Sequence, residues 1–265
     1  MEHLFSVWPD IARRIELAGH ILLLSDFDGT LAPIVDRPEA AVLPDTTRRW
    51  LGLLASNPDV DVGIISGRSL GDLRAKVGIE RVTYAGNHGL EIVGPTVTFV
   101  HPAAEEMRPV LSRLRRELSE AMKRFSGVLV EDKGLTLSIH YRLLDKARIS
   151  EFGDVFRRVV ERAGVSVGIV VTTGKMVYEI RPMVDWSKGN AIEMLLNTSG
   201  ARNRNNPMTM FLGDDSTDED GFKAIERIGG ISVFVGEDIE GCSAQYFVRS
   251  PDEVAMFLGQ LCQAI

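Results

Sequence analysis

The sequence of 265 residues predicts an α/β fold: an open parallel sheet with helices on both faces, interrupted by a smaller inserted α+β domain. Toward both ends of the chain, short and nearly continuous apolar runs alternate with helical segments, as in sheets covered on both faces. The middle of the chain shows longer amphipathic helices and strands of alternating polarity. We therefore expect a core formed by residues 1–103 and 184–265, and an inserted domain formed by residues 104–183.

The strands of the core are predicted from apolar runs bounded by Gly, Asp or Pro, the pattern of buried parallel strands. Helices are expected between them, for instance over Asp45–Ala55, which follows Pro44, and over Ser69–Val77. The predicted strands are Ile21–Ser25, Val60–Ser66, Arg81–Ala85, Met208–Leu212 and Ile231–Val235.

The inserted domain is predicted to hold a small antiparallel sheet with helices on one face. Apolar residues recur every three or four positions in Glu105–Phe125, which predicts an amphipathic helix, and a second one is expected over Ala147–Ala163. Leu135–Arg142 alternates strictly between apolar and polar residues, which indicates a half-exposed strand. Two further short strands are predicted at Val167–Thr172 and Lys175–Arg181.

The composition and charge of the chain limit the kinds of molecule that it is expected to bind. The chain has 30 basic and 37 acidic residues and a net charge of −7, which argues against a nucleic-acid or anionic-membrane surface. The early apolar run Ile21–Leu24 is too short to span a bilayer, and no secretory signal is visible. Cys242 and Cys262 are expected to be free thiols in a reducing compartment. We expect a cytoplasmic monomer that binds a small molecule.

The strongest chemical signal directly follows the first predicted strand of the core. Asp26 and Asp28 stand two residues apart before Gly29, where the carboxyl end of a strand would place a ligand site. This spacing lets one carboxylate act as a nucleophile while the other stands beside the leaving group. An Asp-rich turn in which Gly29 supplies an unusual φ angle is the alternative.

Two further segments could hold a phosphate. Ser66 and Arg68 follow a predicted strand and open a helix, where a hydroxyl and backbone N–H groups suit a phosphate oxygen. A simple N-cap explains the serine equally well. Lys188 opens the helix that leads to Leu196, and taken alone it is a surface lysine.

An acidic segment follows the predicted strand Met208–Leu212. Residues 214–220 include five carboxylates, which repel one another unless a cation or a helix N-terminus offsets them. An acidic first helical turn is the alternative. A Mg²⁺ site explains the cluster better, because Mg²⁺ prefers hard oxygen ligands.

Together these segments form a coherent set for phosphoryl transfer. The sequence resembles the haloacid dehalogenase superfamily of phosphohydrolases, whose four ordered motifs match Asp26 with Asp28, Ser66, Lys188, and Asp214 and Asp215 with Asp218. The resemblance implies the α/β core, an aspartyl-phosphate intermediate, a Mg²⁺ cofactor and an inserted cap domain that closes over the substrate.

The resemblance also implies a role for each matching residue. Asp26 would attack phosphorus, and Asp28 would protonate the leaving oxygen and then deprotonate the hydrolytic water. Ser66 and Lys188 would hold the phosphoryl oxygens. Mg²⁺ would be held by Asp26, the backbone carbonyl of Asp28 and Asp214, with Asp218 supporting a metal-bound water.

Five segments carry a closer resemblance, to the trehalose-6-phosphate phosphatase family: Gly86–Glu91, Glu131–Gly134, His140–Arg142, Glu179–Pro182 and Gly213–Asp220. It implies that Glu131, Lys133 and Glu179 contact glucose hydroxyls, whereas by periodicity alone they could form an ordinary solvated sheet face. The family often has Asp where this chain has Ser187; we expect no catalytic consequence because Lys188 is kept.

The further candidates for substrate binding are Arg68, Asn87, His88 and Arg142, although a loop histidine can serve the loop alone. The resulting hypothesis is a Mg²⁺-dependent hydrolase of trehalose 6-phosphate in trehalose biosynthesis. The same chemistry on sucrose 6-phosphate or a mannosyl phosphate, a phosphomutase, and a non-catalytic sugar-phosphate sensor are the alternatives. The sensor is disfavoured because Asp26, Asp28 and the acidic segment are all present.

Overall fold

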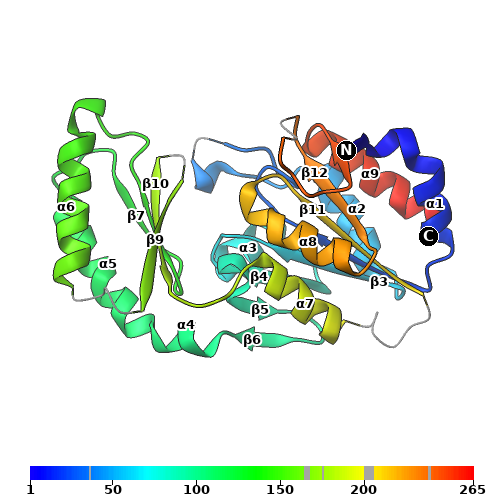
Figure 1. Cartoon of the computed structure of the whole chain (residues 1–265), viewed down its shortest axis with the longest axis horizontal. Coiled ribbons are helices and arrows are strands. Elements are labelled where there is room, and N and C mark those ends of the chain that lie inside the picture. The colour runs from blue at the N-terminus through cyan, green and yellow to red at the C-terminus, as the bar shows by residue number, and fades with distance from the viewer. Residues whose placement is uncertain (36, 164–167, 175, 200–205, 238–239) are drawn as a thin grey trace. The chain divides into compact units, whose positions relative to one another are not determined.

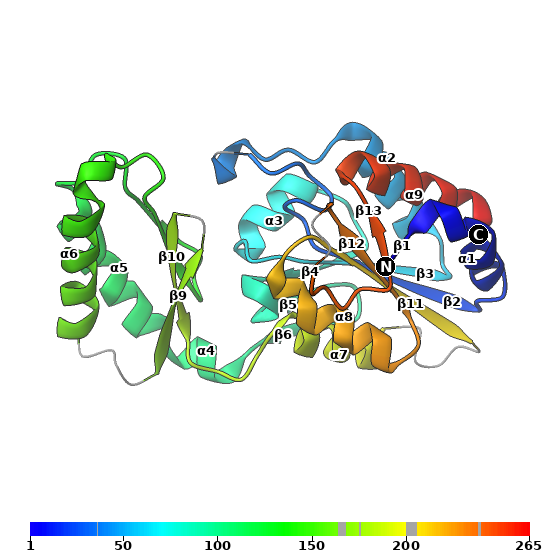
Figure 2. The same cartoon turned by 45° about the horizontal axis from the view of Figure 1, so that its top comes forward.

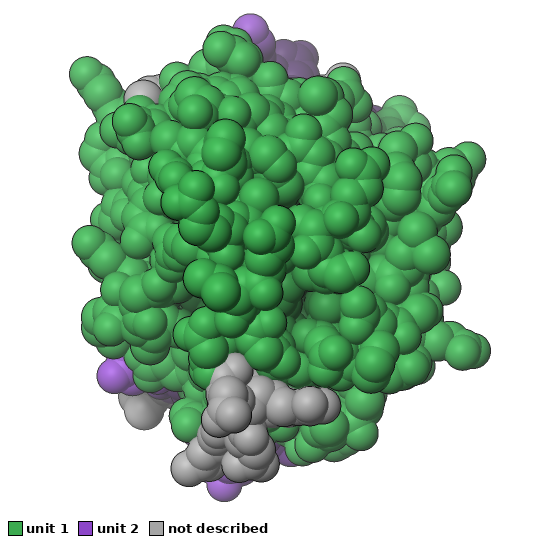
Figure 3. Space-filling model, turned by 90° about the vertical axis from the view of Figure 1, so that its right-hand side faces the viewer, with its two compact units in different colours: residues 1–99, 186–265 green, residues 100–185 purple. Residues whose placement is uncertain are grey.

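The computed structural model describes the chain except for residues 36, 164–167, 175, 200–205 and 238–239. The chain separates into two compact units: unit 1 comprises residues 1–99 and 186–265, and unit 2 comprises residues 100–185. The two segments of unit 1 form one continuous body, whose face is seen in Figure 3.

Unit 1 is built on a sheet of nine strands among the described residues (Figures 1 and 2). The strands lie in the order β1 (Glu2–His3), β13 (Tyr246–Val248), β12 (Ile231–Val235), β11 (Pro207–Gly213), β2 (His20–Ser25), β3 (Val60–Ile65), β4 (Val82–Gly86), β5 (Glu91–Val93) and β6 (Thr98–Val100). Neighbours from β1 to β4 are parallel, whereas β5 runs antiparallel to β4. The antiparallel extension was not predicted.

Helices cover both faces of this sheet. Because successive side chains of a strand point to opposite faces, Ile21 and Leu23 of β2 join one core cluster, and Leu22 and Leu24 join the other. The helices that pack into the first cluster are α1 (Trp8–Glu16), α2 (Asp45–Ser56), α3 (Leu70–Val77) and α9 (Pro251–Ala264). Those that pack into the second are α7 (Lys188–Thr198) and α8 (Glu219–Arg227). The predicted open parallel sheet with helices on both faces is confirmed.

The sheet order determines where the predicted motifs meet. Strand β2 lies between β11 and β3, and both neighbours run parallel to it. The loops that follow these three strands therefore leave the same edge of the sheet. They carry Asp26 and Asp28 after β2, Ser66 after β3, and the acidic segment after β11.

Unit 2 has its own sheet and core. Its four strands, counted within the described residues, pair antiparallel in the order β7 (Leu129–Asp132), β8 (Leu137–His140), β10 (Val177–Pro182) and β9 (Ile169–Gly174). Helices α5 (Arg108–Met122) and α6 (Ile149–Arg162) pack on this sheet, with Leu114 and Phe152 against Ile139 and Ile180.

Two details of the predicted inserted domain are wrong. The helix predicted over Glu105–Phe125 is broken at Met107 into α4 (Pro102–Glu106) and α5. Pro109 lies in the first turn of α5, and its ring and missing N–H prevent a single helix from continuing across Met107.

The strand predicted over Leu135–Arg142 is shorter and less exposed than expected. Strand β8 ends at His140, so Arg142 lies in the following turn and is exposed. Ser138, expected on a half-exposed face, is only 2% exposed because its two strand neighbours in register are Glu131 and Glu179. Val167 and Lys175 lie outside the described residues.

Among the described helices, none combines the length and the apolar character needed to cross a bilayer. Both cysteines, Cys242 and Cys262, are free.

Candidate active site

The loop after β2 is held tightly against β11. The backbone N–H of Asp26 donates to the carbonyl of Leu212 at 2.8 Å, which fixes the first carboxylate at the end of the central strand. Gly29 has a φ of +80°, and a Cβ built on it would lie 2.0 Å from Oδ2 of Asp214. Only glycine allows this approach, so Asp214 comes directly against the loop that carries Asp26 and Asp28.

The acidic segment contributes two of the three clustered carboxylates. Oxygens of Asp26, Asp214 and Asp218 all lie within 4.8 Å of one another. Asp218 is fully buried, and its Oδ2 accepts the backbone N–H groups of Asp214 at 3.0 Å and Asp215 at 3.2 Å. The Thr30 hydroxyl donates to Oδ1 of Asp214 at 3.2 Å. The Asp218 carboxylate thus holds the backbone of the acidic segment in a turn around itself.

Lys188 lies inside this cluster at the start of α7. Its Nζ donates to Oδ1 of Asp218 at 2.7 Å and lies 3.2 Å from Oδ2 of Asp26. The lysine is 3% exposed, so it is a buried cation and not the surface residue that its position alone would suggest. Burial disfavours its charge, but Asp26 and Asp218 outweigh burial and raise the pKa of Lys188.

The carboxylates outnumber this cation. Burial is the largest cause that raises the pKa of Asp26 well above its usual value, opposed by Lys188 and reinforced by the neighbouring carboxylates. Burial, followed by the charges of Asp218 and Asp215, raises the pKa of Asp214 to about 7. Three clustered carboxyl groups thus lie around one buried cation, and burial together with their mutual repulsion opposes ionisation of all three at once.

A divalent metal ion fits this set of groups. Three clustered carboxylates provide hard oxygen donors, which is the donor type that Mg²⁺ takes. Asp218 already uses both oxygens for Lys188 and for backbone N–H groups, so Asp26 and Asp214 offer the freer oxygens. The Asp28 side chain is bound by Arg68, which leaves the predicted backbone carbonyl for a metal.

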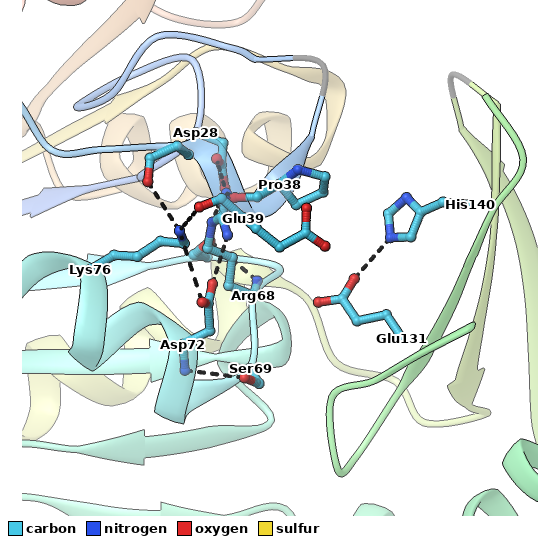
Figure 4. Close-up of polar contacts among 11 residues, drawn as sticks. Asp28, Pro38, Glu39, Arg68, Ser69, Asp72, Lys76, Glu131 and His140 are labelled. Atoms are coloured by element: carbon cyan, nitrogen blue, oxygen red, sulfur yellow. Dashed lines mark hydrogen bonds and ion pairs between the residues drawn. The ribbon is translucent and has the colours of Figure 1, made fainter. Parts of the chain in front are cut away.

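Ser66 directly follows β3 and begins the short loop that connects β3 to α3. It is 1% exposed, and its Oγ accepts the backbone N–H of Arg68 at 3.2 Å, which leaves the hydroxyl proton available for a phosphate oxygen. The guanidinium of Arg68 bonds to Asp28 and to Asp72 of α3 (Figure 4).

Asn87 and His88 form a tight loop against the same segment. Both have positive φ angles, +50° and +58°. The backbone N–H of Asn87 donates to the carbonyl of Arg68 at 2.7 Å, and that of His88 donates to the carbonyl of Ser66 at 2.9 Å. A Cβ on Gly67 would lie 2.7 Å from the His88 ring. The structure thus places both residues beside Ser66 and Arg68.

Unit 2 brings three of its four predicted residues close together: Glu131, Lys133 and Glu179. Glu131 and Glu179 flank Ser138 in register, one on each neighbouring strand. Lys133 Nζ lies 3.5 Å from Oε1 of Glu179. His140 Nε2 lies 2.8 Å from Oε2 of Glu131 (Figure 4). Arg142 lies beyond the strand.

Three supporting residues were not predicted as part of the site: Thr30, Asp72 and Glu91. The Glu91 carboxylate accepts from the Asn87 side chain at 2.7 Å and from the backbone N–H of Leu70 at 3.1 Å. Thr30 stands in the first motif and could have been suspected from its place beside Gly29. Asp72 and Glu91 each stand four residues after a partner, Arg68 and Asn87 respectively, and this spacing is the one local signal that could have indicated them.

The chain is similar to known proteins over most of its length. A family model described as trehalose-phosphatase matches residues 24–252. The chain is 36% identical over 272 residues to probable trehalose-phosphate phosphatase 3 of Oryza sativa subsp. japonica, covering 96% of this chain and 72% of that protein.

Solved structures are similar over nearly the whole chain. The C-terminal domain of C. albicans trehalose-6-phosphate phosphatase has a TM-score of 0.79 and 25% identity, with 97% of each chain covered. A haloacid dehalogenase-like hydrolase from Bacteroides thetaiotaomicron shares the fold, with a TM-score of 0.62 and 17% identity over 91% of this chain and 99% of that one. The chain therefore belongs to the trehalose-phosphatase family, a family of phosphoric monoester hydrolases built on the haloacid dehalogenase fold.

Proposed function

We propose that this protein hydrolyses trehalose 6-phosphate to trehalose and phosphate, with Mg²⁺ as cofactor and with Asp26 as the nucleophile. The observation that carries the proposal is the buried Asp26 carboxylate, which lies 3.2 Å from the Lys188 ammonium and beside Asp214 and Asp218. An anionic nucleophile can approach an anionic phosphate only where cations offset the repulsion.

In the first step Asp26 attacks the phosphorus, and a bond forms between its carboxylate oxygen and the phosphorus. The bond between phosphorus and the sugar oxygen breaks, and that oxygen takes a proton from Asp28. In the second step Asp28 takes a proton from water, whose oxygen attacks the phosphorus of the aspartyl phosphate. Phosphate and the free Asp26 carboxylate are the products.

Buried groups of the same loops would hold the transferring phosphoryl group. The Ser66 hydroxyl keeps its proton for donation, since its oxygen already accepts from the Arg68 backbone. Lys188 is fixed by Asp218 and needs no reorganisation to face the phosphoryl oxygens. Both side chains are nearly inaccessible to water, which strengthens each interaction.

The Asp26 and Asp214 carboxylates, with the Asp28 backbone carbonyl, would hold Mg²⁺, and Asp218 would orient their surroundings. When bound there, Mg²⁺ would neutralise charge on the phosphoryl oxygens and on the carboxylates. The excess of buried carboxylate over cation supports this assignment.

Unit 2 would recognise the sugar. Glu131, Lys133 and Glu179 present acceptors and a donor on one sheet face, and sugar hydroxyls both donate and accept hydrogen bonds. The names of the relatives support a trehalose phosphate as the substrate. On this proposal unit 2 is the specificity cap of a cytoplasmic enzyme of trehalose biosynthesis.

The test is phosphate release from trehalose 6-phosphate, sucrose 6-phosphate, glucose 6-phosphate and mannose phosphates, each with Mg²⁺. Asp26→Asn and a chelator are the controls, and the variant must be shown to fold. Strong preference for trehalose 6-phosphate that both controls abolish is the expected result. Preference for another sugar would overturn the substrate assignment, and a folded, metal-loaded protein that hydrolyses none of them would overturn the proposed function.

A further inference from the structure

Arg68 is engaged by carboxylates on both sides. Its Nε donates to Oδ2 of Asp28 at 2.7 Å and its Nη2 donates to Oδ1 of Asp28 at 2.6 Å, which is a bidentate pair (Figure 4). Its Nη1 donates to Oδ2 of Asp72 at 2.6 Å, and Nη2 also donates to the carbonyl of Pro38 at 2.9 Å. All three guanidinium nitrogens therefore have protein partners.

The surroundings hold this guanidinium in one place. Its side chain is only 9% exposed, and its Cζ lies 5.3 Å from the centroid of the Phe27 ring. The backbone of Arg68 donates to Ser66 Oγ and accepts from the Asn87 N–H. The Arg68 backbone, the Phe27 ring and the two carboxylates together fix the plane of the guanidinium.

The far side of Arg68 is anchored as well. Asp72 stands in the first turn of α3, where its backbone N–H donates to the N-cap Ser69 at 3.2 Å. Lys76, one turn later, lies 4.0 Å from Asp72 and donates to the carbonyls of Glu39 and Ala41 at 2.9 and 3.0 Å. The chain of contacts ties α3 to residues 38–41 through Arg68 and Lys76 (Figure 4).

We propose that Arg68 is a positioning residue: held by Asp72 and the Pro38 carbonyl, it fixes the orientation of the Asp28 carboxylate that exchanges protons with the leaving-group oxygen and with water. The inference rests on the proposed function, in which Asp28 has that role. It replaces the direct substrate contact that the sequence suggested for Arg68, because a phosphate would have to displace Asp28 or Asp72 from the guanidinium.

The geometry leaves Asp28 able to react. A carboxylate offers about four lone-pair sites, and the bidentate pair occupies one on each oxygen. The Asp28 side chain is 39% exposed, so a leaving group and a water molecule can reach it. Arg68 thus restricts where the carboxylate points without covering it.

Two substrates with different leaving groups can distinguish an Arg68 that positions Asp28 from an Arg68 that binds phosphate. The sugar oxygen of trehalose 6-phosphate needs a proton to leave, whereas p-nitrophenolate leaves from p-nitrophenyl phosphate without one. The measurements are the single-turnover rate with trehalose 6-phosphate and the pre-steady-state burst of p-nitrophenol, which both report transfer to Asp26. The inhibition constant of inorganic phosphate reports contact with the phosphoryl group.

For Arg68→Met we expect the single-turnover rate with trehalose 6-phosphate to fall on the order of 10²-fold, as for a misplaced catalytic group. The burst rate with p-nitrophenyl phosphate and the phosphate inhibition constant should stay close to those of the unchanged protein. Asp28→Asn should give the same dependence on the leaving group. The double variant Arg68→Met/Asp28→Asn should be no slower than Asp28→Asn, because the arginine acts through the aspartate.

Two further variants guard against a folding defect. Arg68→Lys keeps the charge but cannot form the bidentate pair, and Asp72→Asn loosens the anchor without touching Asp28. If Arg68→Met does not fold, these two variants should still slow the single-turnover reaction of trehalose 6-phosphate more than the burst with p-nitrophenyl phosphate. The loss of rate should be smaller than the one expected for Arg68→Met. Arg74→Met, which removes an exposed cation from the same helix, is the matched control and should change neither rate.

The outcomes are distinguishable. If Asp28→Asn shows the leaving-group dependence but the Arg68 variants slow both substrates alike, weaken phosphate inhibition and add to the Asp28 loss, Arg68 binds phosphate and the inference is overturned. If the unchanged protein does not turn over trehalose 6-phosphate, or Asp28→Asn is without effect, the proposed function fails and the inference fails with it.

Discussion

The ammonium of Lys188 lies 2.7 Å from Oδ1 of Asp218, and the side chains of both residues are almost completely buried, at 2% and 0% exposure. The same ammonium reaches Asp26 at 3.2 Å. A buried ion pair of this kind is costly to break, because the remaining charge is left without a partner. The pair therefore ties the stability of unit 1 to the arrangement of the candidate nucleophile.

Lys188→Met should lower both activity and stability. Loss of one preorganised cation facing the phosphoryl oxygens should reduce kcat on the order of 10²–10³-fold. Removal of one partner of a buried pair should lower the free energy of unfolding by about 3–5 kcal/mol. Steady-state kinetics and urea unfolding measure the two effects. Lys223→Met removes an exposed cation from α8 and serves as the control; equal activity of the two variants would contradict the role given to Lys188.

The metal-free protein should lose stability as the pH rises from about 4 to about 7. The pKa of Asp214 is raised from 3.8 to about 7, so across this interval the folded state keeps a proton that the unfolded state has released. Raising the pH therefore favours unfolding. Thermal unfolding in a chelator across this range measures the effect.

Two comparisons isolate the contribution of Asp214. Asp214→Asn should weaken the decline in stability with pH, since the asparagine cannot ionise. Added Mg²⁺ should stabilise the protein more at the upper end of the interval than at the lower end, because the metal binds the ionised carboxylate. A variant whose pH dependence matches that of the unchanged protein would show that Asp214 does not cause it.

Gly29→Ala should damage metal binding. The new Cβ would lie 2.0 Å from Oδ2 of Asp214, at a φ of +80° that side chains rarely adopt, so Asp214 has to move. We expect weaker binding of Mn²⁺, measured by calorimetry, and a lower unfolding temperature. Gly52→Ala is the matched control, since nothing lies within 4 Å of a Cβ there. That change should stabilise the protein by about 0.4–1 kcal/mol; unchanged Mn²⁺ affinity in Gly29→Ala would refute the expectation.

Glu179→Gln should raise KM for trehalose 6-phosphate and leave p-nitrophenyl phosphate unaffected. The substitution removes the charge that Lys133 approaches at 3.5 Å and weakens an acceptor for sugar hydroxyls. Loss of a hydrogen bond to a charged group corresponds to about 1.5–3 kcal/mol. The exposed Glu161→Gln in α6 is the control. Equal losses with both substrates would place Glu179 outside sugar recognition.

Much of the core could be predicted because its strands are buried on both faces. In β2, four successive apolar residues carry the signal by themselves, and the motif residues follow at the strand end. The three-residue strand β5 has no such run, so its antiparallel pairing with β4 depends on the tertiary fold. The break at Met107 could have been predicted from Pro109, but the regular apolar spacing on both sides concealed it.

The candidate site was predictable as a set of residues but not as a set of contacts. Asp26, Lys188 and Asp218 meet as the motif order suggested. By contrast, the pairing of Arg68 with Asp28 joins residues 40 positions apart, and no local pattern links them. The burial of Ser138 likewise depends on the long side chains that flank it in two other strands.

The pairing of β2 with β11 also has a consequence for biosynthesis. Thr30 and Asp214, which are hydrogen-bonded across these two segments, are 184 residues apart in sequence. At about 5–20 residues per second, the ribosome needs roughly 10–40 s to make the chain between them. During that interval the apolar strand β2 lacks one of its two sheet neighbours, and such an unpaired edge invites association with other chains. That edge of β2 therefore stays open until β11 and the acidic segment after it have been made.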